Sequence, residues 1–414
     1  MSADLLLRNI RLPDGTATDF AVQDGCISAV GEGLPLSARQ ELDGGGRLLL
    51  PAFVNPHLHA CKSFWRQELA RQPRAVRSLH RFEALGHVKR AYTPESVYER
   101  GVQLVRLALR HGTGALRLFA DVDEQAGLRA FQGLKRLQAS FPFMQIQVVP
   151  FPQNGFARHP GNRELLEQAV ELGCDAVGAV PWLEPTEADG LAHAEFCLNL
   201  AVKHGLPLHA VADDTENPAS RTGAMMAELA LKHSWPLLLT QLGSLGFQDD
   251  AEAARTIDLI RRAGATVISN GHIELITCGD TRQPPPQPQP RGNTRVRELL
   301  AAGVRVLAAQ DDVDNPYYPF GRNDPLDVAL LTAHVAQLAW DDDLDTIRRM
   351  VTTWAAEAIR LSGYGLKVGD RADLVVLDAP DWRSALQFQP ARRFVILGGR
   401  LRAEEQRQTQ LYLD

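Results

Sequence analysis

The chain has 414 residues, of which 45% are hydrophobic and 23% are charged, and its formal net charge is -6. This composition is that of a folded globular protein, and it excludes a disordered, fibrous or coiled-coil chain. The 44 basic and 50 acidic residues form no long run of one sign, so we expect neither a nucleic acid nor a membrane surface as partner.

The N-terminal residues carry no basic region followed by an apolar stretch and a cleavage site, and no segment reaches 18 uncharged apolar residues. We therefore expect a cytoplasmic protein. The five cysteines are odd in number and scattered, which is typical of reduced thiols; they are Cys26, Cys61, Cys174, Cys197 and Cys278. Any metal ion should therefore be held by histidines and carboxylates.

Short strands separated by turns are predicted at both ends of the chain. The first fifty residues contain strands at Leu5–Ile10, Phe20–Val22 and Cys26–Val30, and strand and turn patterns return at 365–380 and 392–402. Together they predict a small β-sandwich domain made of residues 1–50 and 362–414.

Residues 51–361 alternate between apolar strands and amphipathic helices, which indicates an α/β fold. Eight strands are predicted, at Arg47–Asn55, Ala115–Phe119, Met144–Pro150, Ala176–Val180, Pro207–Ala210, Pro236–Gln241, Thr266–Asn270 and Val304–Ala308. This alternation favours a (β/α)8 TIM-like barrel, with a doubly wound open sheet as the alternative.

Two local signals refine this pattern. Thr93-Pro94 supplies a helix N-cap with proline in the first turn, and Gly112 stands where a C-cap glycine belongs. The proline-rich segment from Gln283 to Gly292 cannot form a helix or an inner strand. It is either a spacer, which is the simpler interpretation, or a lid over the functional face.

Polar residues at the ends of the predicted strands are the main candidates for chemistry. His57 and His59 are two positions apart at the end of the first strand, so both imidazoles point the same way. His209 ends the fifth strand, and Asp311 follows the eighth. In a barrel these four side chains converge on one mouth, where they are suited to zinc or iron(II), although a lone His-x-His is equally compatible with a structural role.

Several motifs together resemble the amidohydrolase superfamily, in particular bacterial cytosine deaminases and isopropylammelide amidohydrolases. They are PAFVNPHLHACKSF (51–64), PFPQNG (150–155), AAGVRVLAAQDDVDNPYYPFG (301–321) and the terminal GDRADLVVLD (369–378) with VILGGR (395–400). The resemblance covers nearly the whole chain and implies a barrel with a β-sandwich. It also implies one divalent metal ion, zinc or iron(II), a small nitrogen heterocycle as substrate, and a homo-oligomer.

Carried over residue by residue, the resemblance makes His57, His59, His209 and Asp311 the metal ligands. It makes Asp311 and Asp312 the catalytic carboxylates. The residues expected to line the substrate pocket are Gln153, Lys62, Cys61, Gln241 and Tyr317, with Trp182 as a packing residue or a surface on which a ring stacks.

Three departures from the family pattern concern proton transfer. Ala212 stands where the deaminases have the glutamate that moves a proton, Gln241 replaces a histidine, and Cys61 replaces an acidic residue. The proton is then handled by Asp311 or Asp312, or by Asp213 or Asp214. Cys61 is a nucleophile or soft ligand only if it is not a buried inert thiol.

The remaining histidines lack partner spacing and are expected to be structural or solvated: His80, His87, His111, His159, His193, His204, His233 and His334. His272, two residues after the seventh strand, is expected at the mouth. The sequence therefore predicts a hydrolase acting on a C–N bond of a small heterocycle. The alternative is a catalytically degenerate relative that binds a heterocycle or a protein partner without turnover.

Overall fold

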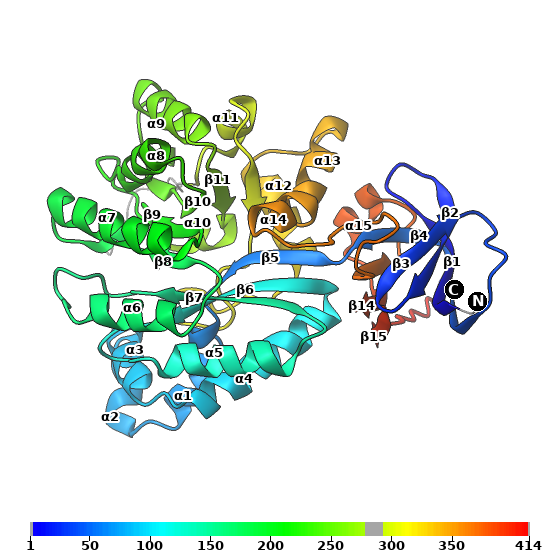
Figure 1. Cartoon of the computed structure of the whole chain (residues 1–414), viewed down its shortest axis with the longest axis horizontal. Helices are drawn as coiled ribbons and strands as arrows, with labels where there is room; N and C mark the ends of the chain where they lie inside the picture. Colours follow the sequence, from blue (N-terminus) through cyan, green and yellow to red (C-terminus); the bar gives the residue numbers. More distant parts are fainter. Residues whose placement is uncertain (1–2, 278–292, 413–414) are drawn as a thin grey trace.

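The computed structural model describes residues 3–277 and 293–412. The described chain forms two units, a larger one in which helices surround parallel strands and a smaller, strand-rich one that contains both ends of the chain (Figure 1). The predicted proline-rich segment from Gln283 to Gly292 lies outside the described residues.

The larger unit contains eight strands, all within residues 53–308. They are β5 (Phe53–Leu58), β6 (Thr113–Asp121), β7 (Gln145–Phe151), β8 (Val177–Ala179), β9 (Leu208–Ala212), β10 (Leu237–Gln241), β11 (Thr266–Ser269) and β12 (Val306–Ala308). The helices are α1 (Trp65–Ala70), α2 (Arg74–Arg77), α3 (Arg81–Arg90), α4 (Pro94–Arg110), α5 (Arg129–Ser140), α6 (Asn162–Glu171), α7 (Glu187–His204), α8 (Thr222–His233), α9 (Asp250–Arg262), α10 (Gly271–Thr277), α11 (Val296–Ala301), α12 (Pro325–Val335), α13 (Asp341–Met350) and α14 (Thr353–Ala358). Three 3-10 turns, η1 (Ala60–Lys62), η2 (Pro181–Leu183) and η3 (Gly243–Gly246), follow strand ends.

These eight strands do not form the closed barrel that the sequence predicts. They pair in parallel in two sheets, β5-β6-β7 and β8-β9-β10-β11-β12, and within the described chain no ladder joins β7 to β8. The backbones of β7 and β8 still approach closely, since a Cβ added at Gly178 would lie 2.4 Å from the Pro150 carbonyl oxygen. Pro150 has no N–H and β8 has only three residues, which leaves little backbone for a ladder.

The predicted first strand, Arg47–Asn55, is wrong in its extent. Its first half belongs to β4 (Ala38–Pro51) of the smaller unit, where Leu48 to Pro51 pair antiparallel with β13 (Leu374–Leu377). A new strand, β5, then starts at Phe53. Pro51 lacks an N–H, and the Ala52 N–H donates to the Asp373 carbonyl at 2.8 Å, so the chain passes from one unit to the other at this point.

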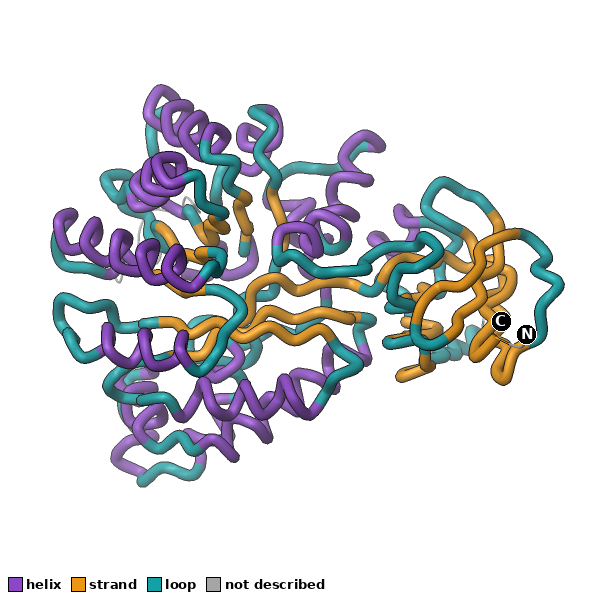
Figure 2. The backbone as a smooth tube through the Cα atoms, viewed as in Figure 1, coloured by secondary structure: helices purple, strands orange, loops and turns teal. Residues whose placement is uncertain are grey.

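The smaller unit combines both ends of the chain, as the sequence predicts. Its further elements are β1 (Ala3–Arg11), β2 (Ala17–Gln23), β3 (Cys26–Gly31), α15 (Trp382–Phe388), β14 (Arg392–Leu397) and β15 (Arg400–Glu404). The strands form one seven-stranded sheet in the order β15-β14-β13-β4-β1-β2-β3, so the expectation of a two-sheet sandwich is met only in part. The reason is the 14-residue strand β4, which pairs with β1 on one side and, through its last residues, with β13 on the other. Figure 2 shows the strands of this unit in orange at the right. Leu5, Phe20, Leu374 and Ile396 share one apolar cluster, so the two halves enclose a common core.

The cap predicted for the first long helix is confirmed in α4. The Thr93 side chain accepts from the Ser96 N–H at 3.0 Å, the Ser96 hydroxyl accepts from the Thr93 N–H at 3.2 Å, and Pro94 opens the helix. Gly112 follows the helix with a φ of 75°, which a glycine adopts without strain. Among the helices of the described chain, none combines the length and apolar character needed to span a membrane.

Candidate metal centre and cavity

His57, His59, His209 and Asp311 lie together at the C-terminal end of the strands. Nε2 of His57 is 3.3 Å from Nε2 of His59 and 3.0 Å from Oδ1 of Asp311, and His59 Nε2 is 3.5 Å from the same oxygen. Nδ1 of His57 is 3.2 Å from Nε2 of His209. We call these four residues the histidine–aspartate cluster.

Backbone pairing brings the two ends of this cluster together. The Asp311 N–H donates to the His57 carbonyl at 3.0 Å, and the His59 N–H donates to the Asp311 carbonyl at 2.7 Å. This isolated parallel bridge between Leu58 and Asp311 joins β5 to the residues after β12. Asp311 has a φ of 58°, an uncommon value for a residue with a side chain. Strained backbone of this kind is typical of functional sites.

The cluster has the electrostatic character of a cation site. Burial, more than any neighbouring charge, lowers the pKa of His59 and of His209 well below the ordinary value, so both imidazoles are neutral. Asp311 is 1% exposed, and its Oδ1 accepts no hydrogen bond within the described chain. Ligand atoms of His57, His59 and Asp311 all lie within 4.8 Å of one another. These three residues therefore fit a divalent metal ion.

His209 differs from the other three because of a residue that the sequence analysis missed. Arg117, in the middle of β6, is 1% exposed, and its Nη1 lies 3.4 Å from Nδ1 of His209. Since a guanidinium only donates, Nδ1 of His209 accepts here, and a neutral ring then carries its hydrogen on Nε2. In this arrangement His209 lies next to the three best-placed ligands but does not offer them a free nitrogen. The sequence does mark Arg117, because it is a charged residue inside an otherwise apolar strand.

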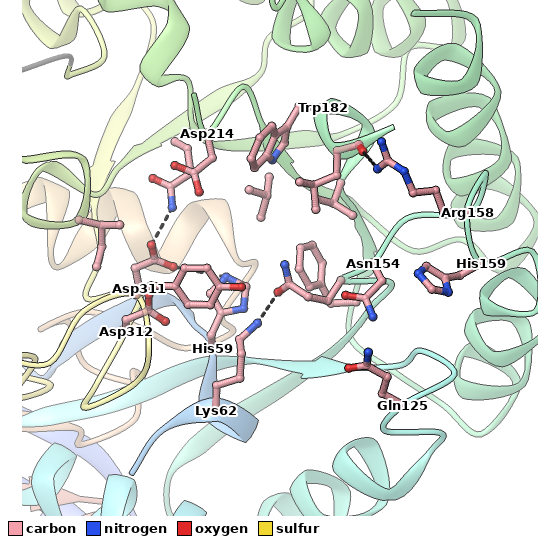
Figure 3. A pocket seen from close by; sticks show the side chains of 18 residues that line it. His59, Lys62, Gln125, Asn154, Arg158, His159, Trp182, Asp214, Asp311 and Asp312 are labelled. Carbon is pink, nitrogen blue, oxygen red and sulfur yellow. Dashed lines mark hydrogen bonds and ion pairs between the residues drawn. The ribbon is translucent and has the colours of Figure 1, made fainter. Parts of the chain in front are cut away.

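A cavity of about 430 Å³ opens above the cluster, a volume that suits a small organic ligand (Figure 3). Residues from several strand ends line it: His59, Lys62, Gln125, Phe151, Gln153, Asn154, Arg158, His159, Val180, Trp182, Leu183, Val211, Asp214, Gln241, Ile273, Asp311, Asp312 and Tyr317. The structure thus brings the predicted Lys62, Gln153, Gln241, Asp312 and Tyr317 around one cavity with two of the four predicted ligands, His59 and Asp311.

On one side of the cavity lies a buried network of paired charges. Lys62 Nζ is 3.1 Å from Oδ1 of Asp121, Lys89 Nζ is 2.8 Å from Oδ2 of the same carboxylate, and Lys89 also pairs with Asp123. We call these four residues the lysine–aspartate network. Burial alone would raise the pKa of Asp121, but the two ammonium groups outweigh it and lower this pKa to about 2. Asp121 was also missed, although a polar residue that ends an apolar strand is a recognisable signal.

Lys62 extends this network into the cavity. Its Nζ donates to Oε1 of Gln153 and lies 5.7 Å from the centre of the Tyr317 ring (Figure 3). Because an ammonium group only donates, this contact fixes the carbonyl oxygen of the Gln153 amide toward Lys62. The NH2 group of Gln153 is then the end of the amide that remains for a ligand.

Gln241 and Asp312 flank the histidine–aspartate cluster. Gln241 Nε2 donates to Oδ2 of Asp311 at 2.6 Å, so Gln241 orients this carboxylate and leaves Oδ1 toward the histidines. Asp312 accepts a hydrogen bond from the Asn315 side chain. Burial, followed by the charge of Asp311, raises the pKa of Asp312 well above its ordinary value.

Cys61, predicted to line the pocket, is not one of the lining residues. It is fully buried, and its Sγ accepts the Asp121 N–H at 3.3 Å. Burial, more than the charge of Asp121, raises the pKa of this thiol to about 12. Cys61 therefore supports the backbone behind the cavity. These surroundings fit the alternative in which Cys61 is a buried inert thiol, and they do not favour a reactive thiolate.

Two expectations for histidines are corrected by the structure. His272 does not line the cavity; its Nε2 lies 2.6 Å from the Gln310 carbonyl oxygen, so it packs against the chain beside the cluster. His159, expected to be structural or solvated, lines the cavity rim and pairs with Glu124 at 3.2 Å. No sequence signal distinguished His159, because it lies in a loop after β7.

The chain is similar in sequence and in structure to several known proteins. The model of the amidohydrolase family matches residues 83–403. N-isopropylammelide isopropyl amidohydrolase of Pseudomonas sp. (strain ADP) is 26% identical, and the match covers 96% of both chains. The structure of 5-methylcytosine deaminase from Klebsiella pneumoniae with 5-fluorocytosine superposes with a TM-score of 0.89, 28% identity and coverage of 98% and 99%. That of N-isopropylammelide isopropylaminohydrolase from Burkholderia multivorans gives a TM-score of 0.81, 26% identity and coverage of 98% and 99%.

Proposed function

The chain belongs to the amidohydrolase family, and on that premise we propose that it hydrolyses a C–N bond of a small nitrogen heterocycle, by deamination or amide or amidine hydrolysis. The observation that carries this proposal is the histidine–aspartate cluster, with two of its members in the wall of a ligand-sized cavity. The relatives named above act on ring compounds of this kind, which supports the same substrate class here.

We propose one divalent metal ion, zinc or iron(II), held by His57, His59 and Asp311, with His209 completing the set once its ring is released from Arg117. Such an ion supplies Lewis acidity, which makes water a stronger acid and polarises the attacked carbon. Gln241 holds Asp311 in the orientation that this requires, because it occupies Oδ2 and leaves Oδ1 free. Asp312 faces the cavity beside this centre, where it contacts the ring.

The opposite wall recognises the ring. The Gln153 NH2 group and the Lys62 ammonium group are both donors, so they suit a carbonyl oxygen or an unprotonated ring nitrogen. Burial lowers the pKa of Lys62, but Asp121, Tyr317 and Cys61 together outweigh it, so the net shift is upward and this donor stays charged. Tyr317 and Trp182 offer aromatic faces to a planar ring. An oxo-substituted pyrimidine or triazine has this pattern of acceptors.

The experiment loads the purified chain with zinc or with iron(II), measures the bound metal, and assays 5-methylcytosine, N-isopropylammelide and cyclic ureas. We expect about one metal ion per chain and turnover of at least one ring compound. Asp311→Asn should remove both, with an unchanged circular dichroism spectrum. A chain that stays metal-free and inactive while it still binds a ring compound would contradict a hydrolase.

That last result would favour the second candidate, a degenerate family member that binds a heterocycle or a protein partner without turnover. Ala212 and Gln241 favour it, because neither side chain transfers a proton. Several expectations from the sequence stay predictions. They are a cytoplasmic location, a homo-oligomeric state, and the absence of nucleic-acid and membrane partners. The domain boundaries, with residues 51–361 as one domain and 1–50 with 362–414 as the other, also stay predictions.

A further inference from the structure

The end of β9 shows why the alanine at 212 need not leave the site without a proton carrier. Ala212 is fully buried in the apolar cluster that also contains Leu242 and Leu245, and it is not one of the cavity-lining residues. Its neighbour Val211 lines the cavity instead. Position 212 therefore faces away from a bound ring in this chain.

Asp213 redirects the chain immediately after β9. It has a φ of 55°, and its carboxylate accepts hydrogen bonds from the Ser220 hydroxyl at 2.5 Å and from the N–H groups of Thr222 and Gly223 at 2.8 and 2.7 Å. These bonds fix Asp213 at the start of α8, so its carboxylate is committed to the fold. The left-handed turn at Asp213 changes the direction of the next residue.

Asp214, the next residue, lines the cavity together with Gln241 and Asp311. Figure 3 shows its carboxyl group turned into the cavity on the side of Asp311. Its Oδ1 is buried and has no hydrogen-bond partner among the described residues. A buried carboxyl oxygen without a partner is costly, and such atoms are typical of functional sites.

The other candidates for proton transfer are engaged elsewhere: the Asp312 carboxylate accepts a hydrogen bond from the Asn315 side chain. Asp311 gives Oδ2 to Gln241 and directs Oδ1 to the histidines, and Cys61 is outside the cavity wall. The surroundings of Asp214 suit the task, because burial, followed by the charges of Asp311 and Glu216, raises its pKa to about 7. A carboxyl group of this kind exchanges a proton near neutral pH.

We propose that Asp214 is the catalytic residue that carries a proton from the attacking water to the leaving nitrogen. The proposal rests on the C–N hydrolysis proposed above. The water oxygen forms a bond to the ring carbon, and the bond between that carbon and the leaving nitrogen breaks. Asp214 takes one water proton and passes it to the leaving nitrogen, while the second water proton ends on the adjacent ring nitrogen. The products are a ring carbonyl and a neutral amine or ammonia, and Asp214 returns to its starting state.

The test compares zinc-loaded wild type with Asp214→Asn, Asp214→Glu and Asp214→Ala, and with Glu167→Gln, an exposed carboxylate on α6, as the control. The substrate is whichever ring compound of the panel the wild type hydrolyses. We expect Asp214→Asn to lower kcat by about 10²–10⁴-fold, with little change in KM and about one zinc ion still bound. Asp214→Glu should keep part of the activity, and formate should restore part of it to Asp214→Ala.

Two results overturn this assignment while the proposed function stands. In the first, Asp214→Asn hydrolyses the ring compound as fast as wild type. In the second, Asp214→Asn loses its zinc, which would make Asp214 a ligand. If Asp214→Asn does not fold, the pH profile of kcat in Asp214→Glu decides, because a profile identical to that of wild type contradicts proton transfer by residue 214. A zinc-loaded wild type that hydrolyses nothing in the panel contradicts both proposals.

Discussion

The two clusters of charged and ionisable residues beside the cavity, the lysine–aspartate network and the histidine–aspartate cluster, differ in how their members are paired. In the lysine–aspartate network, each oxygen of the Asp121 carboxylate lies within ion-pair distance of an ammonium group, so opposite charges balance even though Oδ2 accepts no regular hydrogen bond. In the histidine–aspartate cluster, Oδ1 of Asp311 and Nδ1 of His59 have no hydrogen-bond partner in the described chain. Buried charges that pair with opposite charges maintain structure, whereas a buried carboxylate oxygen that faces only imidazoles is suited to a cation that the chain does not supply. This difference supports the proposal that a metal ion binds at the histidines, while the lysines support the cavity wall.

Removing a histidine from the cluster should have the largest effect. We expect His59→Ala to lower metal affinity by more than about 100-fold and to abolish turnover, because it deletes one of three converging ligand atoms. Metal content after dialysis measures this directly. His159→Ala at the cavity rim is the control, and equal metal loss in both variants would contradict the assignment.

Breaking the lysine–aspartate network should act on stability. Asp121→Asn leaves two buried ammonium groups with one carboxylate, so we expect the free energy of unfolding at pH 7 to fall by roughly 3–5 kcal/mol in urea. Glu95→Gln, which breaks the exposed pair with Arg136, should change it by less than about 1 kcal/mol. Similar losses in the two variants would show that the buried network stabilises the fold no more than an exposed ion pair does.

The same network predicts that the stability of the fold depends on pH. The pKa of Asp121 is lowered from 3.8 to about 2 in the folded chain, so its ionised form stabilises the fold above the unfolded value. That stabilisation should disappear as the pH falls from about 4 to about 2. Urea unfolding at several pH values should show a steeper acid loss in wild type than in Asp121→Asn, and parallel curves would contradict the lowered pKa.

Gln241→Ala should have an intermediate effect, because Gln241 positions Asp311 without being a ligand itself. We expect metal affinity to fall by about 10–100-fold with unchanged stoichiometry at saturating metal. Titration with zinc in a competing chelator measures this. An affinity equal to that of wild type would show that Asp311 is oriented by the backbone bridge alone.

Cys61→Ala should have the smallest effect on function. Its thiol is buried with a pKa of about 12, so it stays protonated and does not attack a substrate. We expect kcat to change by less than about threefold and the native thiol to resist alkylation. If Cys61→Ala lost turnover while it kept its full metal content, Cys61 would have to contact the substrate, and this prediction would be wrong.

Patterns along the chain predicted much of this molecule. Apolar strands alternating with capped helices gave the α/β class and eight strands in nearly the right places, because such patterns are local. The end of β4 was misplaced, since an apolar run does not reveal which of two sheets its residues join. The gap between β7 and β8 was missed for the same reason: sequence periodicity does not report hydrogen bonds between strands.

The sequence by itself determined which residue types are present for chemistry: two histidines at a strand end, a third on β9, and an aspartate after β12. Only the tertiary structure decided how they act, because contacts between distant segments set each environment. It turned Ala212 toward the apolar layer and Asp214 toward the cavity, placed Arg117 against His209, and buried Cys61 behind the wall. A side chain's pKa and partners depend on these contacts, which no local pattern encodes.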